Sequence, residues 1–133
     1  MRALNPPGWP TPRGYSNGIA AEGTLVFVAG QVGWNAAGQF EADDFAGQAR
    51  QALENIRAVL AVAGARPEHV TRMTWYVTDT REYLAQLKDV GRAYRDVMGW
   101  HYPAMTLVEV RALLEEGAKV EIEATAVLPR SVP

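Results

Sequence analysis

The sequence predicts an α+β fold, in which a mixed sheet carries two helices on one face, within a single domain of residues 1–133. Three observations support this prediction. Several short segments alternate apolar and polar residues with period two, as half-buried strands do. Two longer segments repeat apolar residues at helical spacing. The length of 133 residues is that of one ordinary domain, and no linker, repeat or low-complexity block divides it.

The predicted strands are rich in β-branched and aromatic residues and end at turn-forming residues. In chain order they are 16–21, which is weak, and then 24–32, 70–79, 104–110 and 119–128. Glu22 and Gly23 predict a hairpin turn between the first two strands. Residues 1–14 are rich in proline and predict an irregular lead-in.

The two predicted helices have ordinary start signals. Asp43 or Asp44 caps the first helix, which covers about 45–63. The second covers about 80–98 and contains Gly91, which costs about 1 kcal/mol relative to alanine. The apolar positions of the second helix are Leu84, Leu87, Val90, Tyr94 and Val97 or Met98.

The order β-β-α-β-α-β-β leaves one face of the sheet without helices. Strands such as 24–32 are too apolar for that face to be fully wet. Association with further copies of the chain is the expected solution, because a large exposed apolar surface is rare on a soluble monomer.

Composition excludes several classes of function. The chain has no cysteine, which rules out a disulfide framework, a cysteine-ligated metal site and a cysteine nucleophile. Two histidines are too few for a histidine-rich metal site, and a net charge of −2 argues against binding along a nucleic-acid backbone. Neither a signal peptide nor a membrane-spanning run is present, so we expect a cytoplasmic protein without a membrane partner.

Three polar groups remain as candidates for chemistry, since no phosphate-binding glycine loop, metal-ligand spacing or nucleophile elbow is present. Tyr15 opens the first strand, Gly30 and Gln31 end the second, and Glu121 and Glu123 share one face of the last. Each group also has a structural explanation: a rim aromatic, a bulge with its loop, and charges that solubilise an edge strand. From the residues alone, both explanations stay open.

Taken together, the element order and several segments resemble the RidA/YjgF family of reactive intermediate deaminases. The segments are YSNGI, VAGQV, QARQALENIRAVLAVAG, YVTD, YPAMTLVEV and KVEIEATAV, and they cover about Tyr15 to Val127. The resemblance implies a homotrimer of chorismate-mutase-like subunits whose sheets face inward. It also implies small-molecule clefts between adjacent subunits, in which imines and enamines such as 2-iminopropanoate are hydrolysed without a metal or other cofactor.

The resemblance further implies roles for individual residues. The family's cleft tyrosine falls on Tyr15, and the backbone after the second strand falls on Ala29, Gly30 and Gln31, so we expect these residues to bind substrate. The cleft glutamate falls on Glu121, which is therefore the expected catalytic residue, positioning or activating water.

Position 105 departs from the family pattern. The arginine that grips the substrate carboxylate falls on Met105, which we still expect to contact substrate together with Thr106. A thioether cannot replace the two parallel charge-assisted bonds of a guanidinium. The family's small residue two positions later is Leu107, and an asparagine of its second helix aligns with Gly91. Arg111 is the nearest cation in sequence, and nothing in the sequence places it in the cleft.

Two functions therefore remain open. One is hydrolysis of an imine, an enamine or a related reactive metabolite, but not standard 2-iminopropanoate deamination. The other is a non-catalytic metabolite-binding or regulatory role. Ribonuclease activity and translation inhibition, also attached to the family, fit poorly with the acidic balance of the chain. The sequence leaves open whether Trp34, Trp100 or His101 enters the cleft.

Overall fold

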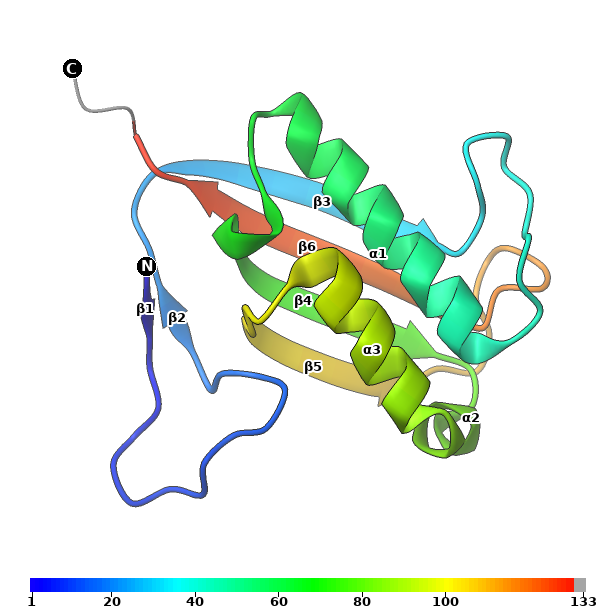
Figure 1. Ribbon diagram of the computed structural model, residues 1–133, viewed down its shortest axis with the longest axis horizontal. Coiled ribbons are helices and arrows are strands. Elements are labelled where there is room, and N and C mark those ends of the chain that lie inside the picture. The colour runs from blue at the N-terminus through cyan, green and yellow to red at the C-terminus, as the bar shows by residue number, and fades with distance from the viewer. Residues whose placement is uncertain (131–133) are drawn as a thin grey trace.

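The computed structural model of the protein describes residues 1–130, so the last three residues of the predicted domain lie outside the described part (Figure 1). Its main sheet has the strand order β3-β6-β4-β5. The strands are β3 (Thr24–Val32), β4 (Val70–Val77), β5 (Ala104–Glu109) and β6 (Val120–Leu128). β4 and β5 run parallel, whereas β6 is antiparallel to both of its neighbours, so the predicted mixed sheet is confirmed.

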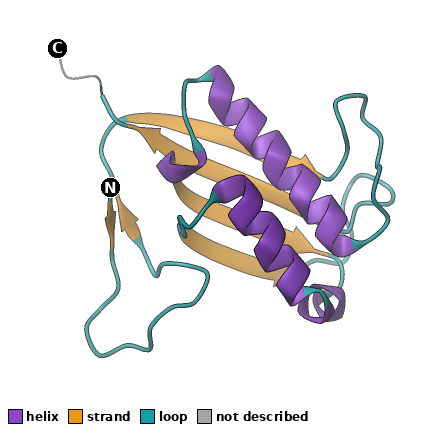
Figure 2. Ribbon diagram, in the orientation of Figure 1, coloured by secondary structure: helices purple, strands orange, loops and turns teal. Residues whose placement is uncertain are grey.

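The helices cover one face of this sheet (Figure 2). They are α1 (Phe45–Val62), α2 (Thr80–Ala85) and α3 (Leu87–Met98), and a 3₁₀ turn, η1 (Pro67–His69), precedes β4. Asp44 caps α1, since its carboxylate accepts from the Gly47 N–H at 3.3 Å. The core lies between the helices and the sheet, and its fully buried members include Leu53, Ile56, Leu60, Met73 and Ile122. Among residues 1–130, no helix is both long and apolar enough to cross a membrane.

The first predicted strand and its hairpin are wrong. Only Ile19–Ala20 (β2) is a strand, and it pairs with Arg2–Ala3 (β1) in a separate ribbon rather than with β3. The preceding residues are held elsewhere, because the Ser16 N–H donates to the Pro103 carbonyl at 3.0 Å beside β5. Residues 2–3 of the predicted irregular lead-in therefore form a strand. Because β2 does not pair with β3, β3 lies at the edge of the main sheet.

The second predicted helix is divided at Gln86, which has φ −112° and ψ 22°. The Gln86 side-chain oxygen accepts from the Ala46 N–H at 2.9 Å, at the start of α1. The break changes which residues face the core, so Leu84 and Leu87 are 63% and 49% exposed. The remaining positions are buried as predicted, namely Val90, Tyr94, Val97 and Met98.

The face without helices, which we call the open face, carries both apolar and charged side chains. Leu25, Phe27 and Val108 are 58%, 72% and 40% exposed there. Glu121 and Glu123 lie on the same face, on β6, which is an interior strand between β3 and β4. The explanation that these glutamates solubilise an edge strand is therefore wrong.

Close packing at Gly33 fixes α1 to the end of β3. A Cβ at Gly33 would come within 2.6 Å of the Cα and the carbonyl oxygen of Gln48. The Gln48 side chain is buried, donates to the Gly117 carbonyl at 3.0 Å and accepts from the Lys119 N–H at 2.8 Å. Helix, strand end and the loop before β6 therefore meet at a position that has no room for a side chain.

Gly33→Ala should lower the free energy of unfolding by about 1–3 kcal/mol, because the added methyl meets backbone that cannot turn aside. Urea unfolding would measure the change. Gly91→Ala is the matched control: its Cβ would meet only the flexible Arg95 Nη1 at 3.2 Å, so it should raise the stability by up to about 1 kcal/mol. An unchanged midpoint for Gly33→Ala would mean that α1 is not held tightly on β3.

Candidate functional site

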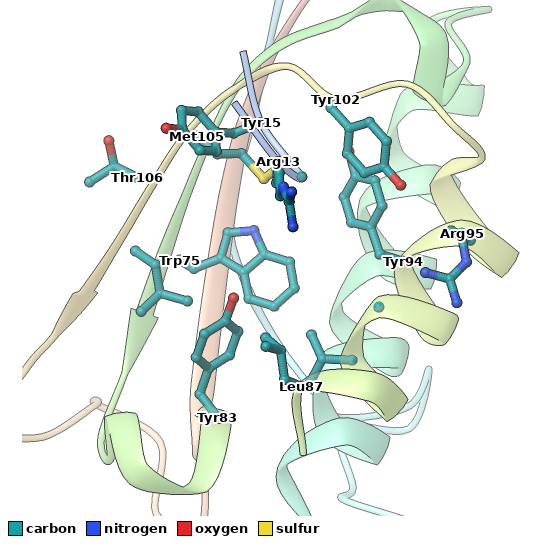
Figure 3. A pocket seen from close by; sticks show the side chains of 14 residues that line it. Arg13, Tyr15, Trp75, Tyr83, Leu87, Tyr94, Arg95, Tyr102, Met105 and Thr106 are labelled. Atoms are coloured by element: carbon teal, nitrogen blue, oxygen red, sulfur yellow. The ribbon is translucent and has the colours of Figure 1, made fainter. Parts of the chain in front are cut away.

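A pocket with a volume of about 510 Å³ opens between the β4–β5 edge of the sheet and the helices α2 and α3 (Figure 3). We call it the β5 pocket. Its aromatic walls are Tyr15, Trp75, Tyr83, Tyr94 and Tyr102, and its aliphatic walls are Leu87, Val90, Met105 and Leu107. Arg13 and Arg95 are the cations that border it.

Strand alternation explains the floor of the β5 pocket. β4 and β5 are in parallel register, with Met73 beside Met105 and Trp75 beside Leu107. Because side chains alternate between the two faces, these residues all point toward the helices. Gly91 in α3 leaves room above them, since it has no side chain.

Two stacked tyrosines form one wall of the pocket. The rings of Tyr94 and Tyr102 are 5.4 Å apart and nearly parallel, and the Tyr94 hydroxyl donates to the His101 carbonyl at 2.6 Å. Burial raises the pKa of Tyr94, and the neighbouring Tyr102 raises it further. Burial also raises the pKa of Tyr83. Both hydroxyls therefore stay protonated and neutral near pH 7.

The N-terminal segment lines one side of the pocket. The Ser16 hydroxyl donates to the Tyr102 carbonyl at 2.7 Å, which anchors the segment beside β5. Gly14 has φ +75°, a left-handed conformation that a side chain would strain, and this turn sets Arg13 and Tyr15 at the pocket. In Figure 3 the Arg13 guanidinium lies on the same side as Met105.

Trp75 brings a hydrogen-bond donor without an acceptor. The residue is only 4% exposed, and its indole Nε1 is buried with no hydrogen-bond partner among the described residues. In Figure 3 the indole nitrogen is turned toward the side of the pocket where Arg13 and Met105 lie. Such a donor is unusual, because buried polar groups are nearly always paired.

Three of the predicted binding residues border the β5 pocket. Tyr15 and Met105 line it, and Met105 is half-buried and also packs against the core. Thr106 borders it too, but its side chain points away (Figure 3). Thr106 is in register with Thr74, which itself pairs with Glu123 on the open face.

The other predicted residues lie together on the far side of the sheet. The pairing of β3 with β6 shifts between Val28 and Gln31, so Ala29 and Gly30 form the bulge that the sequence suggested. A Cβ at Gly30 would come within 2.5 Å of Glu121 Oε2, which means that the carboxylate lies over the glycine. The Gln31 side chain donates to the Ala29 carbonyl at 3.1 Å.

Glu123 accepts a hydrogen bond from a neighbouring side chain on β4. The Tyr76 hydroxyl donates to Glu123 Oε1 at 2.8 Å, and this hydrogen bond is the main reason that the pKa of Tyr76 is raised. Tyr76 is in register with Glu121, but the hydrogen bond goes to Glu123. Glu121 therefore keeps its carboxylate unshared within the described chain, beside the bulge.

The two groups do not meet within one chain. Tyr15 and Met105 belong to the β5 edge, whereas Ala29, Gly30 and Glu121 belong to β3 and β6. β4 lies between β5 and β6 in the sheet. At one margin of the sheet, a single chain thus has a pocket with apolar walls that arginines border. At the other margin it has a carboxylate beside a glycine bulge.

Several pocket residues were not predicted from the sequence, namely Arg13, Trp75, Tyr83, Tyr94, Arg95 and Tyr102. Arg13 was missed because it lies in a segment expected to be irregular. Its position two residues before Tyr15 was the available signal. Arg111 is exposed and lines neither the β5 pocket nor the more open pocket near the N-terminus. The same holds for Trp34, whereas Trp100 and His101 line the second, more open pocket near the N-terminus.

Comparison with known proteins gives a consistent family. A family model described as Endoribonuclease L-PSP matches residues 10–128. The RutC family protein y4sK of Sinorhizobium fredii is 38% identical over 111 residues, 83% of each chain. The 2-iminobutanoate/2-iminopropanoate deaminase of Salmonella typhimurium is 33% identical over 108 residues, 79% of this chain and 80% of the relative.

Solved structures agree. The Rid family protein YyfB of Yersinia pestis, whose function is unknown, superposes with a TM-score of 0.83 at 33% identity, covering 96% of this chain and 98% of that one. Escherichia coli TdcF with bound serine gives a TM-score of 0.67 at 31% identity, covering 98% and 100%. The chain therefore belongs to the Endoribonuclease L-PSP family and has the fold of its Rid (YjgF/RidA) members, as the sequence resemblance indicated.

Proposed function

We propose that the protein is a hydrolase that releases ammonia from a small imine or enamine, in a site completed between two subunits of a homotrimer. One observation carries the proposal: the binding groups Tyr15 and Met105 and the carboxylate Glu121 lie at different margins of one chain. A cleft that joins them needs two chains. Support also comes from the deaminase name of the Salmonella relative and from the serine bound to TdcF.

The homotrimer accounts for the open face. Leu25, Phe27 and Val108 are exposed there on a sheet that has helices on its other face alone. Association of three sheets would remove this apolar surface from water, and each Å² that is buried stabilises the assembly by about 25 cal/mol. A closed ring also brings the β3–β6 margin of one subunit to the β5 margin of the next.

Glu121 is the base in the proposed reaction. Its carboxylate takes a proton from water, the resulting hydroxide adds to the carbon of the C=N bond, and the proton passes to the nitrogen. The hydroxyl proton of the resulting carbinolamine then passes through Glu121 to the nitrogen as the C–N bond breaks and the C=O bond forms, so that ammonia and a carbonyl product leave. The bulge at Ala29 and Gly30 leaves backbone groups outside the β-ladder, where they can bind the substrate.

A non-catalytic metabolite-binding role is the second candidate. Met105 favours it, because no cation projects from β5 into the pocket to hold a substrate carboxylate from the strand. If the protein only binds its ligand, the pocket holds that ligand without turnover, and Glu121 is a polar group at the subunit interface.

The trimer can be tested by mass. Light scattering of the purified protein should give three times the chain mass. Phe27→Lys should yield monomers, because a lysine on the buried face would lose its hydration. Leu114→Lys is the matched control, since Leu114 is 93% exposed in the loop before β6, and it should remain trimeric. A monomeric wild-type protein at micromolar concentration would contradict the intersubunit site.

Glu121→Gln should lower kcat for imine hydrolysis by about 10²- to 10⁴-fold, because the amide cannot accept the proton of water. Gly30→Ala should lower kcat as well, by pushing the Glu121 carboxylate aside without unfolding the chain. Ammonia release measures both variants. Glu123→Gln is the control and should cost far less, since an amide oxygen still accepts from Tyr76. Equal losses of kcat in Glu121→Gln and Glu123→Gln would contradict the role of Glu121 as the base.

Turnover of 2-iminopropanoate should be at least about tenfold slower in kcat/KM than that of the Salmonella relative, measured side by side as pyruvate and ammonia release. The reason is that Met105 stands where the family's arginine would bind the substrate carboxylate from β5, and losing one partner of a desolvated ion pair typically costs about 2–5 kcal/mol. An exposed cation such as Arg13 offsets only part of that loss for a short acid. Comparable rates would show that the chain handles this small acid without an arginine on β5.

A further inference from the structure

We propose that the β5 pocket takes a carboxylate with an aromatic ring, held at its charged end by Arg13 and along its ring by the aromatic walls. The inference rests on the proposed function only in placing the ligand in this pocket. Two arginines border the pocket. Arg95, on α3, lies over the Trp100 ring at 5.5 Å, whereas Arg13, from the N-terminal segment, lies on the side of Met105 and the Trp75 nitrogen (Figure 3).

The charge of Arg13 is available to a ligand. Arg13 borders the pocket and has no ion-pair partner in the part of the chain that the structure describes. The Ser16 hydrogen bonds to Tyr102 and Pro103 anchor the segment that carries it. A planar guanidinium binds both oxygens of a carboxylate with two parallel bonds.

Trp75 adds a second donor on the same side of the pocket. Its buried Nε1–H lacks an acceptor among the described residues, and an unpaired buried donor destabilises the fold unless a ligand supplies an acceptor. Met105 is the flexible neighbour that has to turn aside, and methionine does so readily because it has three rotatable bonds. The Arg13 guanidinium and the Trp75 indole are both donors, and no carboxylate lines the pocket, so this end favours a ligand group that only accepts, as a carboxylate does.

The size and walls of the pocket favour a ring over a short chain. A volume of about 510 Å³ lies within the range of roughly 300–1,000 Å³ for sites of drug-sized ligands, so the pocket has more room than a short-chain acid fills. The Tyr94–Tyr102 stack and the Tyr83 and Trp75 rings present aromatic surface, on which a ligand ring can pack face to face or edge to face. Gly91 leaves the helix side open.

Calorimetry with three probes tests the proposal on the wild-type protein. 3-Phenylpropanoate carries both ring and charge, 3-phenylpropanamide lacks the charge, and propanoate lacks the ring. We expect 3-phenylpropanoate to bind at least about tenfold more tightly than either of the others, and its affinity to fall with added salt, because Arg13 is partly solvated. Equal affinity for the acid and the amide, or for the acid and propanoate, would overturn the proposal.

Variants assign the charge to Arg13. Arg13→Gln should lower the affinity for 3-phenylpropanoate by tenfold or more and leave the affinity for 3-phenylpropanamide unchanged. The exposed control Arg111→Gln should change neither affinity. In Arg13→Gln/Met105→Arg the cation moves to β5, and affinity for the acid should return. Unchanged affinity in Arg13→Gln would overturn the assignment. A loss for both probes would mean that Arg13 orders the segment rather than binding the carboxylate.

Gly91→Ala tests the ring. The added methyl should weaken the binding of 3-phenylpropanoate several-fold and leave the affinity for propanoate unchanged, in a protein that is at least as stable as the wild type.

Ammonia release from the imines of phenylpyruvate and pyruvate separates this inference from the proposed reaction. Selective binding without any release overturns the hydrolase and leaves the ligand class standing. Release from both imines without preference for the ring overturns the ligand class and leaves the hydrolase standing.

Discussion

The packing of α1 and α3 against a single face of the sheet is the constraint on which the rest of the structure depends. It requires every strand to send alternate residues into the core, and the close contact of Gly33 with Gln48 fixes α1 in place. It also leaves Phe27 and its neighbours uncovered on the open face. The proposed assembly with further copies and the position of the candidate site both follow from this asymmetry.

The same asymmetry divides the chemistry between two margins of the sheet. Where α3 overhangs β5, the chain forms a pocket with aromatic walls and a cation, suited to holding a ligand. Where β3 bulges against β6, it exposes the Glu121 carboxylate beside Gly30, suited to moving a proton. In the proposed trimer neither margin completes the reaction alone, so the assembly itself decides whether the protein is active.

Much of this could be predicted from the sequence, because period-two and helical patterns are local. They gave the bounds of α1, β4, β5 and β6 closely. The order of strands depends on long-range pairing, so the central place of β6 was missed. The break at Gln86 depends on a contact with Ala46, forty residues away in sequence. Arg13 reaches the pocket through tertiary contacts of Ser16, which no local pattern records.

The claim that two chains complete one site can be tested directly by cross-linking, because the chain has no native cysteine. Ala29 on β3 and Tyr15 beside β5 lie at opposite margins of one sheet, across three strand intervals of about 4.8 Å each. A protein carrying both Ala29→Cys and Tyr15→Cys, treated with a short bismaleimide, should give a covalent trimer on a denaturing gel. Each single variant can give dimers at most, since it has one cysteine per chain. Monomer bands alone from the double variant would contradict the shared site.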